Sequence, residues 1–166
     1  MELTFTDATL NDLPLIVATY NSTIPGRMVT ADLEPVRVED KLKWFNEHNP
    51  SSRPLWLVKL DGVYAGWVSF QNFYGRAAYN GTAEISIYLE EGLRGKGLGK
   101  KCLEIAMNTC PQLKIKTLLG FIFGHNLPSL KLFYELGFEK WGDLPGIANM
   151  EGVERDLLIL GKKITH

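Results

Sequence analysis

A run of glycine and lysine, Leu93-Arg94-Gly95-Lys96-Gly97-Leu98-Gly99-Lys100, separates a strand-like segment from an amphipathic helical one, and it constrains this chain more than any other feature. Glycines let a backbone approach an anion closely and point successive N–H groups at it. The helix that follows adds the positive end of its dipole. The sequence therefore predicts a phosphate-binding loop between a strand and a helix.

Two common phosphate-binding patterns do not fit this run. A P-loop reads GxxxxGK followed by Ser or Thr, and neither residue follows a lysine here. A dinucleotide-binding loop reads GxGxxG with an acidic residue about 20 positions later, where this chain has Lys114 and Lys116. The pattern that fits is RxxGxG, from Arg94 to Gly99. A plain glycine turn is the alternative, but one turn rarely needs three glycines and a pair of lysines.

Composition indicates one domain over residues 1–166, because this length and a hydrophobic content of 45% allow a substantial core. The net charge of −1 gives no global basic field, so neither nucleic acid nor a membrane surface is an expected partner. No long apolar run and no charged-then-apolar leader occurs, and we expect a cytoplasmic protein. Cys102 and Cys110 lie in one predicted helix, about 12 Å apart. We expect two core thiols with no disulfide and no metal.

Apolar periodicity and turn residues predict the order of elements. Asp61-Gly62 between two apolar runs is a strong hairpin signal. The alternation of strand and helix in the second half indicates a mixed α/β chain, with a parallel strand pair inside a mixed sheet. The expected strands are Leu3–Thr6, Pro54–Leu60, Val63–Phe70, Ala83–Leu89, Thr117–Phe123, Phe138–Trp141 and Arg155–Gly161; the expected helices follow Asp12, cover Val38–Asn46, follow the glycine run and cover Pro128–Leu136.

Four segments in order resemble the cofactor half of the GNAT superfamily of acetyl-CoA-dependent N-acetyltransferases. They are the strand with Glu84, the RxxGxG loop, Asn126 with Ser129, and Leu136-Gly137-Phe138. Further matches resemble the branch that contains phosphinothricin and methionine-sulfone acetyltransferases: Tyr20-Asn21, Trp44-Phe45, Gly66-Trp67, Arg76-x-Ala78-Tyr79, Thr82-Ala83-Glu84 and Tyr88. The resemblance weakens after Gly142, where that branch carries a Lys-Phe-Gly-Arg-Trp pattern before an Asp and this chain matches only at Gly152 and Asp156.

The resemblance implies a single-domain, mostly antiparallel sheet of six to seven strands, flanked by about four helices. A parallel strand pair would splay apart at the cofactor cleft. It implies acetyl-CoA as co-substrate, no metal, a small-molecule amine as acceptor, and a homodimer as a possible assembly.

The resemblance also implies roles for individual residues around the cofactor. The backbone from Arg94 to Lys100 would hold the pyrophosphate. The strand Ile87-Tyr88-Leu89 would pair with the pantetheine arm, and an N–H of Ile87 or Tyr88 would bind the thioester oxygen. Asn126 and Ser129 would contact the arm, although Asn126 before Pro128 equally suits a helix cap.

Glu84 is the candidate general base, because a protonated amine cannot attack a thioester and a carboxylate can remove the proton. A solvated strand end is the alternative interpretation. Phe133 stands where the family often has Tyr, and this branch often His, as acid for the departing thiolate. Tyr134 is a weak substitute, because one residue is about 100° around a helix. His125 is another titratable option.

Arg76 and Arg27 are candidate acceptor-binding residues, because a guanidinium suits a carboxylate or phosphinate, and ordinary surface charge is the alternative. Tyr79 is a third candidate, since it lies in the Arg76-x-Ala78-Tyr79 segment that resembles this branch. These residues favour a small amino acid or an analogue as the acceptor. A polyamine would need clustered carboxylates, and Asp32, Glu34, Glu39 and Asp40 keep that possibility open. A peptide N-terminus as the acceptor and a CoA-binding module without turnover are two further hypotheses.

Overall fold

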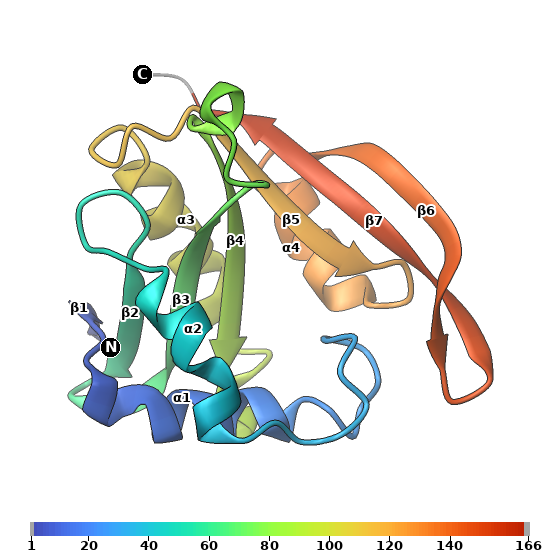
Figure 1. The fold of residues 1–166 in the computed structure, drawn as a ribbon, viewed down its shortest axis with the longest axis horizontal. Coiled ribbons are helices and arrows are strands. Elements are labelled where there is room, and N and C mark those ends of the chain that lie inside the picture. Colours follow the sequence, from blue (N-terminus) through green and yellow to red (C-terminus); the bar gives the residue numbers. More distant parts are fainter. Residues whose placement is uncertain (1, 165–166) are drawn as a thin grey trace.

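The computed structural model describes residues 2–164, which form one sheet with helices on both faces (Figure 1). The sheet has seven strands in the order β1-β2-β3-β4-β5-β7-β6. All neighbours are antiparallel except β4 and β5. The mixed, mostly antiparallel fold expected from the sequence is confirmed. The strands are β1 (Leu3–Asp7), β2 (Leu55–Leu60), β3 (Val63–Asn72), β4 (Thr82–Leu89), β5 (Thr117–Phe123), β6 (Glu139–Met150) and β7 (Val153–Lys163).

Four α-helices cover the two faces of this sheet. They are α1 (Leu13–Ser22), α2 (Leu42–Asn46), α3 (Leu98–Thr109) and α4 (Leu127–Glu135). In Figure 1, α1 and α2 lie in front of the sheet and α3 and α4 lie behind it. The larger core joins α3 and α4 to the rear face, with Phe70 and Leu103 among its members. A smaller core joins α1 to the front face through Ile16, Leu57 and Trp67.

The first hairpin forms as its turn signal predicts. Asp61 and Gly62 both have positive φ, 50° and 81°, which is the backbone that a two-residue turn of type I′ requires. The register Leu60↔Val63 closes the β2–β3 hairpin directly around them. The local sequence therefore determines this turn, whereas an irregularity between Val58 and Lys59 shifts the register farther along the hairpin.

The last hairpin is much longer than the sequence indicates. The predicted strands Phe138–Trp141 and Arg155–Gly161 are shorter than the observed β6 and β7. Both observed strands continue to a turn at Glu151-Gly152, where φ is 57° and 89°. Gly142, Pro145 and Gly146 interrupt the apolar alternation in β6, and the register shifts twice along it. An irregular, exposed strand gives no clear period-2 signal.

Both cysteines are free and buried, as predicted. Burial raises the pKa of the Cys102 thiol to about 11 and that of Cys110 to about 12. Both thiols therefore stay neutral near pH 7 and pack as small apolar groups. Over residues 2–164, no helix is both long enough and apolar enough to cross a membrane.

His48 connects α2 to the front face of the sheet. Its Nδ1–H donates to the Trp44 carbonyl at 2.9 Å, so the unprotonated Nε2 accepts from the Ser69 hydroxyl at 2.6 Å. Ser69 on β3 is fully buried. Burial lowers the pKa of His48, because the charged ring is poorly solvated there.

We predict that His48 makes the fold less stable in mild acid. The neutral ring stabilises the fold fully above its unfolded pKa of about 6.5, and this contribution is lost as the pH falls below that value. The free energy of unfolding, measured in urea between about pH 7.5 and 5, should therefore fall more steeply for the wild type than for His48→Gln, which keeps a donor and an acceptor. Equal slopes would contradict the prediction.

Candidate active site

The glycine run forms the turn between β4 and α3. Gly95 and Gly97 have φ of 77° and 78°, and a Cβ added at either position would meet no atom within 4 Å. The first backbone bond of the helix is Lys101 N–H to Gly97 O, and within residues 2–164 the N–H groups of residues 95–100 have no protein acceptor. Six free donors at the start of a 12-residue helix, beside open space, form a cradle for an anion.

The third glycine of the run has a different function. A Cβ at Gly99 would lie 3.1 Å from Cδ1 of Leu132 on α4, so this glycine permits the close approach of α3 to α4. The cradle is thereby held against the rear core. The free N–H groups and open space of the cradle therefore fit a pyrophosphate, and the exposed Lys96 and Lys100 belong to the same segment.

Strands β4 and β5 pair for only three positions before they separate. Their parallel register is Thr82↔Thr117, Ala83↔Leu118 and Glu84↔Leu119. Gly81 O accepts from Thr117 N–H on β5, whereas Thr82 O accepts from Phe73 N–H on the β3 side. Because these directions alternate along a strand, Ile85, Ile87 and Leu89 point their N–H and C=O groups into the gap. Of the two candidates for the thioester oxygen, this alternation favours Ile87 over Tyr88.

Glu84 lies at the point where the gap opens. It pairs with Gln71 on β3 and Leu119 on β5. Its partly buried carboxylate has no hydrogen bond or ion pair within residues 2–164, and burial raises its pKa. A partly desolvated carboxylate without a partner is a stronger base than a solvated one. The geometry suits a general base better than a solvated strand end.

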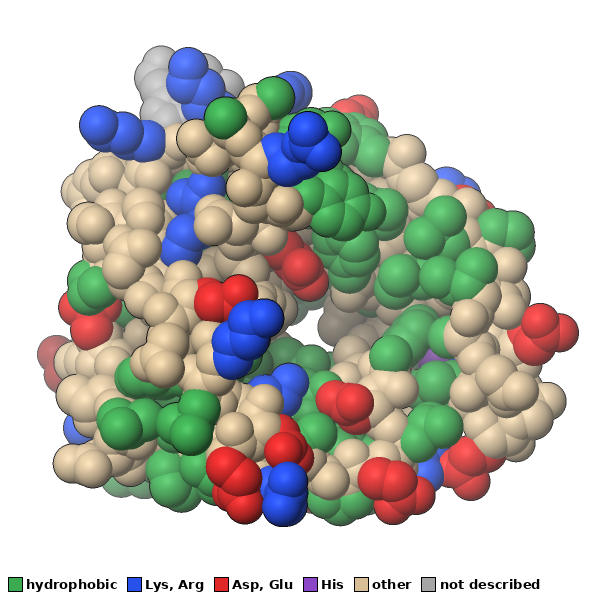
Figure 2. All heavy atoms as spheres, in the orientation of Figure 1, with side chains coloured by type: hydrophobic (Ala, Val, Ile, Leu, Met, Phe, Trp, Pro, Cys, Tyr) green, Lys and Arg blue, Asp and Glu red, His purple; other side chains and the backbone are tan. Residues whose placement is uncertain are grey.

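Ser86 and Tyr88 share the front face of β4 with Glu84, because side chains alternate along a strand. Tyr88 stacks on Trp67 with ring centroids 4.5 Å apart, and Tyr20 of α1 lies 5.4 Å from Tyr88. Trp44 of α2 meets Trp67 edge-on at 5.3 Å. These four rings line a pocket of about 60 Å³, which Ser86 also borders. We call it the aromatic pocket. Figure 2 shows this face hollowed at its centre, with hydrophobic side chains along the margin toward β5.

The phenols of the aromatic pocket stay neutral at physiological pH. Burial, together with a hydrogen bond to Asp32, raises the pKa of Tyr20 to about 12. Burial raises the pKa of Tyr88 further. The Tyr20 hydroxyl donates to the Asp32 carboxylate and lies 2.5 Å from the Thr30 hydroxyl. The loop after α1 thus holds the Tyr20 ring in place.

The candidates for the general acid lie in different surroundings. Phe133 is buried, and a Cβ on Gly120 of β5 would be 2.7 Å from its ring, so it packs in the rear core. Tyr134, the next residue on α4, is not part of this core, because 44% of its surface is exposed. His125 donates from Nε2 to Arg27 O at 2.8 Å, and its buried Nδ1 has no partner within residues 2–164. A role for Tyr134 stays a prediction.

Asn126 caps α4, as its alternative interpretation predicts. Its side-chain oxygen accepts from Ser129 N–H at 3.4 Å, and its amide donates to Met28 O at 3.3 Å. The cap thereby ties the loop after α1 to the carboxyl end of β5. Contact of Asn126 and Ser129 with a cofactor stays a prediction.

The candidate acceptor-binding residues lie in two loops. Arg27 forms an ion pair with Glu151 of the β6–β7 turn and donates to the carbonyls of Ile24 and Leu33, so its guanidinium already has protein partners. Arg76 precedes a short 3₁₀ turn (Ala77–Tyr79), is exposed, and has no side-chain partner within residues 2–164. The ring centroids of Tyr79 and Phe73, in the same loop, are 5.4 Å apart. Arg76 is thus the freer of the two arginines.

The carboxylates that suited a polyamine do not form a cluster in the aromatic pocket. Asp40 and Glu39 pair with Arg37 on the surface, and Asp32 accepts from Tyr20. Glu34 is exposed. Over residues 2–164, no three His, Cys, Asp or Glu side chains are grouped so as to hold a metal ion.

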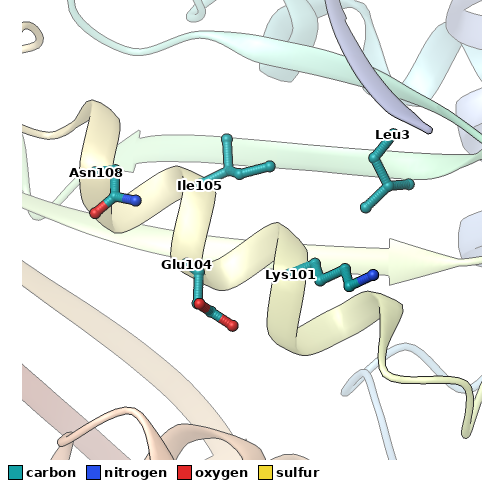
Figure 3. A pocket seen from close by; sticks show the side chains of 5 residues that line it. All are labelled: Leu3, Lys101, Glu104, Ile105 and Asn108. Carbon is teal, nitrogen blue, oxygen red and sulfur yellow. The ribbon is translucent and has the colours of Figure 1, made fainter. Parts of the chain in front are cut away.

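A larger hollow of about 240 Å³ lies on the opposite side of the molecule. Leu3, Lys101, Glu104, Ile105 and Asn108 line it on the flank of α3 beside β1 (Figure 3). Its lining includes neither Glu84 nor the gap between β4 and β5. The candidate residues for the chemistry lie instead beside the smaller aromatic pocket.

Comparison with known proteins gives concordant matches. A sequence profile described as the acetyltransferase (GNAT) family matches residues 18–138. A Bacillus subtilis protein named "Putative phosphinothricin acetyltransferase YwnH" is 54% identical over 155 residues, 93% of this chain and 94% of the relative. An L-methionine sulfoximine/L-methionine sulfone acetyltransferase of Pseudomonas aeruginosa is 28% identical over 162 residues, 96% of this chain and 94% of the relative.

A solved structure gives a match to the same family. It is a GNAT superfamily phosphinothricin acetyltransferase from Sinorhizobium meliloti in complex with acetyl-CoA, at 26% identity and a TM-score of 0.90. The match covers 99% of this chain and 89% of that one. The similarity in sequence and in fold therefore extends over most of each chain.

Proposed function

We propose that this chain, which belongs to the acetyltransferase (GNAT) family and uses acetyl-CoA, transfers the acetyl group to the amine of a small amino acid or amino-acid analogue. The observation that carries the proposal is the position of Glu84. Its unpaired carboxylate shares one strand face with the aromatic pocket and lies where the β4–β5 gap opens. The acetyltransferase names of the relatives favour turnover over a binding module.

Acetyl-CoA supplies an activated acetyl group as a thioester. The cradle N–H groups of residues 95–100 would bind its pyrophosphate, and the N–H and C=O groups in the gap would pair with its arm. The Ile87 N–H would donate to the thioester oxygen, where negative charge develops during attack. Glu84 would take the proton of the acceptor amine, directly or through water, and leave it nucleophilic.

Direct attack needs no acid at the Phe133 position. A thiol with a pKa near 8.5 departs tolerably as a thiolate. Much of the rate would come from holding amine and thioester together, an effect that reaches about 7 to 11 kcal/mol in well-oriented systems. The cytoplasmic location, the homodimer and the single domain over residues 1–166 stay predictions.

We predict that Gly97→Asp abolishes CoA binding. The change places a carboxylate where the cradle would receive pyrophosphate, at a φ of 78° that disfavours a side chain. Calorimetry with CoA measures the loss. Gly62→Asp is the matched control, because Gly62 has a φ of 81° and equally open surroundings in the β2–β3 turn. A folded Gly97→Asp protein with wild-type affinity would refute the cradle.

Replacing the base should change the dependence of the rate on pH. Glu84→Gln should lower kcat at least about 10-fold near pH 7 and spare CoA affinity. The deficit should shrink as the pH rises, because the amine then loses its proton unaided. The pH–rate profile measures this, with the exposed Glu104→Gln as control. A Gln variant with the wild-type profile would remove Glu84 from the mechanism.

Arg76 should bind the α-carboxylate of the acceptor. Arg76→Ala should raise KM for free amino-acid acceptors about 10- to 150-fold, equivalent to about 1.5 to 3 kcal/mol for a charged hydrogen bond. Acceptors with an amidated carboxylate should lose far less, because they never used the guanidinium. Equal losses on both kinds of acceptor would show that Arg76 only shapes the loop, and would favour a peptide or polyamine acceptor.

A further inference from the structure

Lys41 places a positive charge on the wall of the aromatic pocket. Its ammonium nitrogen lies 4.9 Å from the centroid of the Tyr20 ring and 5.9 Å from that of Trp44. Both distances are within the range of a cation–π contact, which holds an ammonium group without neutralising it. The residue is half-buried and borders the pocket together with Ser86 and Tyr88.

Within residues 2–164 no carboxylate forms an ion pair with this ammonium group, although its charge helps to lower the pKa of the neighbouring Asp40. The neighbouring acids on its own segment, Glu39 and Asp40, pair with Arg37 instead. Asp32 accepts from the Tyr20 hydroxyl. Over residues 2–164, the lining of the pocket therefore contains this cation, in contact with two ring faces, and no carboxylate.

The size and charge of the pocket restrict what it can receive. About 60 Å³ holds roughly four to six water-sized groups, which suits the end of a small side chain and not a long polyamine. A positive charge between desolvated rings attracts an anion more strongly than it would in water, and it repels a second ammonium group. The charge of Lys41 therefore favours an anionic group over a second ammonium group at this wall of the pocket.

Arg76 and Lys41 lie near opposite ends of β4. Arg76 lies in the loop that leads into the first residue of β4. Lys41 lies against Tyr20, whose ring contacts Tyr88 near the last residue of the strand. The strand segment from Glu84 to Tyr88 spans about 13 Å. An acceptor with two acidic groups could therefore use both cations, one at each end of the strand.

We propose that Lys41 is a specificity-determining residue, which binds an anionic group at the end of the acceptor's side chain. The inference rests on the proposed function, with Arg76 binding the α-carboxylate and Glu84 receiving the proton of the α-amine. The preferred acceptor is then an α-amino acid whose short side chain ends in an anion, such as a phosphinate. The aromatic rings cover the apolar part of that side chain.

Two acceptors that differ in this group test the proposal. Phosphinothricin carries an anionic phosphinate, whereas methionine sulfone carries a neutral sulfone. Lys41→Met keeps the apolar stem and removes the charge, Lys41→Arg keeps the charge, and Lys43→Met on the exposed side of α2 is the control. KM and kcat are measured for both acceptors. Binding is followed separately, in the presence of CoA, by the fluorescence of Trp44 and Trp67.

Lys41→Met should raise KM for phosphinothricin at least about 10-fold, with kcat and CoA affinity nearly unchanged. KM for methionine sulfone should change less than about threefold, and Lys41→Arg should recover most of the affinity. Equal losses on both acceptors, or an effect of Lys43→Met as large, would overturn the proposal, because Lys41 would then only support the rings.

Failure of the proposed function is distinguishable from failure of this inference. If neither compound is acetylated, the acceptor class is wrong, and the fluorescence titrations still decide the role of Lys41. Weaker binding of phosphinothricin alone in Lys41→Met supports the inference. Titrations that are the same in the wild type and the variant, or no binding of phosphinothricin at all, overturn it.

Discussion

The site depends on the separation of β4 from β5 after the pair Glu84↔Leu119. Beyond that pair, β4 continues beside β3 and β5 continues beside β7, so the sheet stays whole on both sides of the gap. The backbone groups of Ile85, Ile87 and Leu89 face the gap and need a partner, because unpaired strand edges are costly where water is excluded. An extended ligand arm can supply that partner. The same separation places Glu84 at the inner end of the gap.

Burial, more than charge pairing, determines the electrostatics around this gap. It raises the pKa of Glu84, and it contributes most to the raised pKa values of Tyr20 and Tyr88. The carboxylate becomes more basic while the phenols stay neutral. Within residues 2–164, Lys41 is the one charged side chain in the lining of the aromatic pocket, while the Asp32 carboxylate lies on the Tyr20 hydroxyl, and the charges of Asp32 and Glu84 add to the raised pKa of Tyr88.

Local signals in the sequence predicted the parts of the site that are continuous in the chain. The strand with Glu84, the glycine turn and α3 follow one another directly, and Asp61-Gly62 specifies its own hairpin. The β6–β7 hairpin was underestimated, because its Glu151-Gly152 turn is a weak signal and Pro145 lies within an exposed strand. Periodicity reports burial, and this hairpin buries few of its side chains.

The aromatic pocket could not be read from the sequence, because its four rings come from two helices and two strands. Each of these rings lies in a segment that resembles the family: Tyr20, Trp44, Trp67 and Tyr88. The sequence therefore indicated each residue separately, but nothing in it indicated that the four lie together. Lys41 carried no signal of its own, since a lysine beside acidic residues usually indicates a solvated surface. The choice of Ile87 over Tyr88 likewise required the hydrogen-bond directions at Gly81 and Thr82.

Amide hydrogen exchange at the edge of β4 tests the central claim most directly. NMR resolves the Ile87 amide in the free protein and in the presence of saturating CoA. The account predicts rapid exchange in the free protein, because that N–H faces the gap, and strong protection with CoA bound, together with the amides of residues 95–100. An Ile87 amide whose exchange is the same with and without CoA would contradict the account, even if the cradle amides become protected.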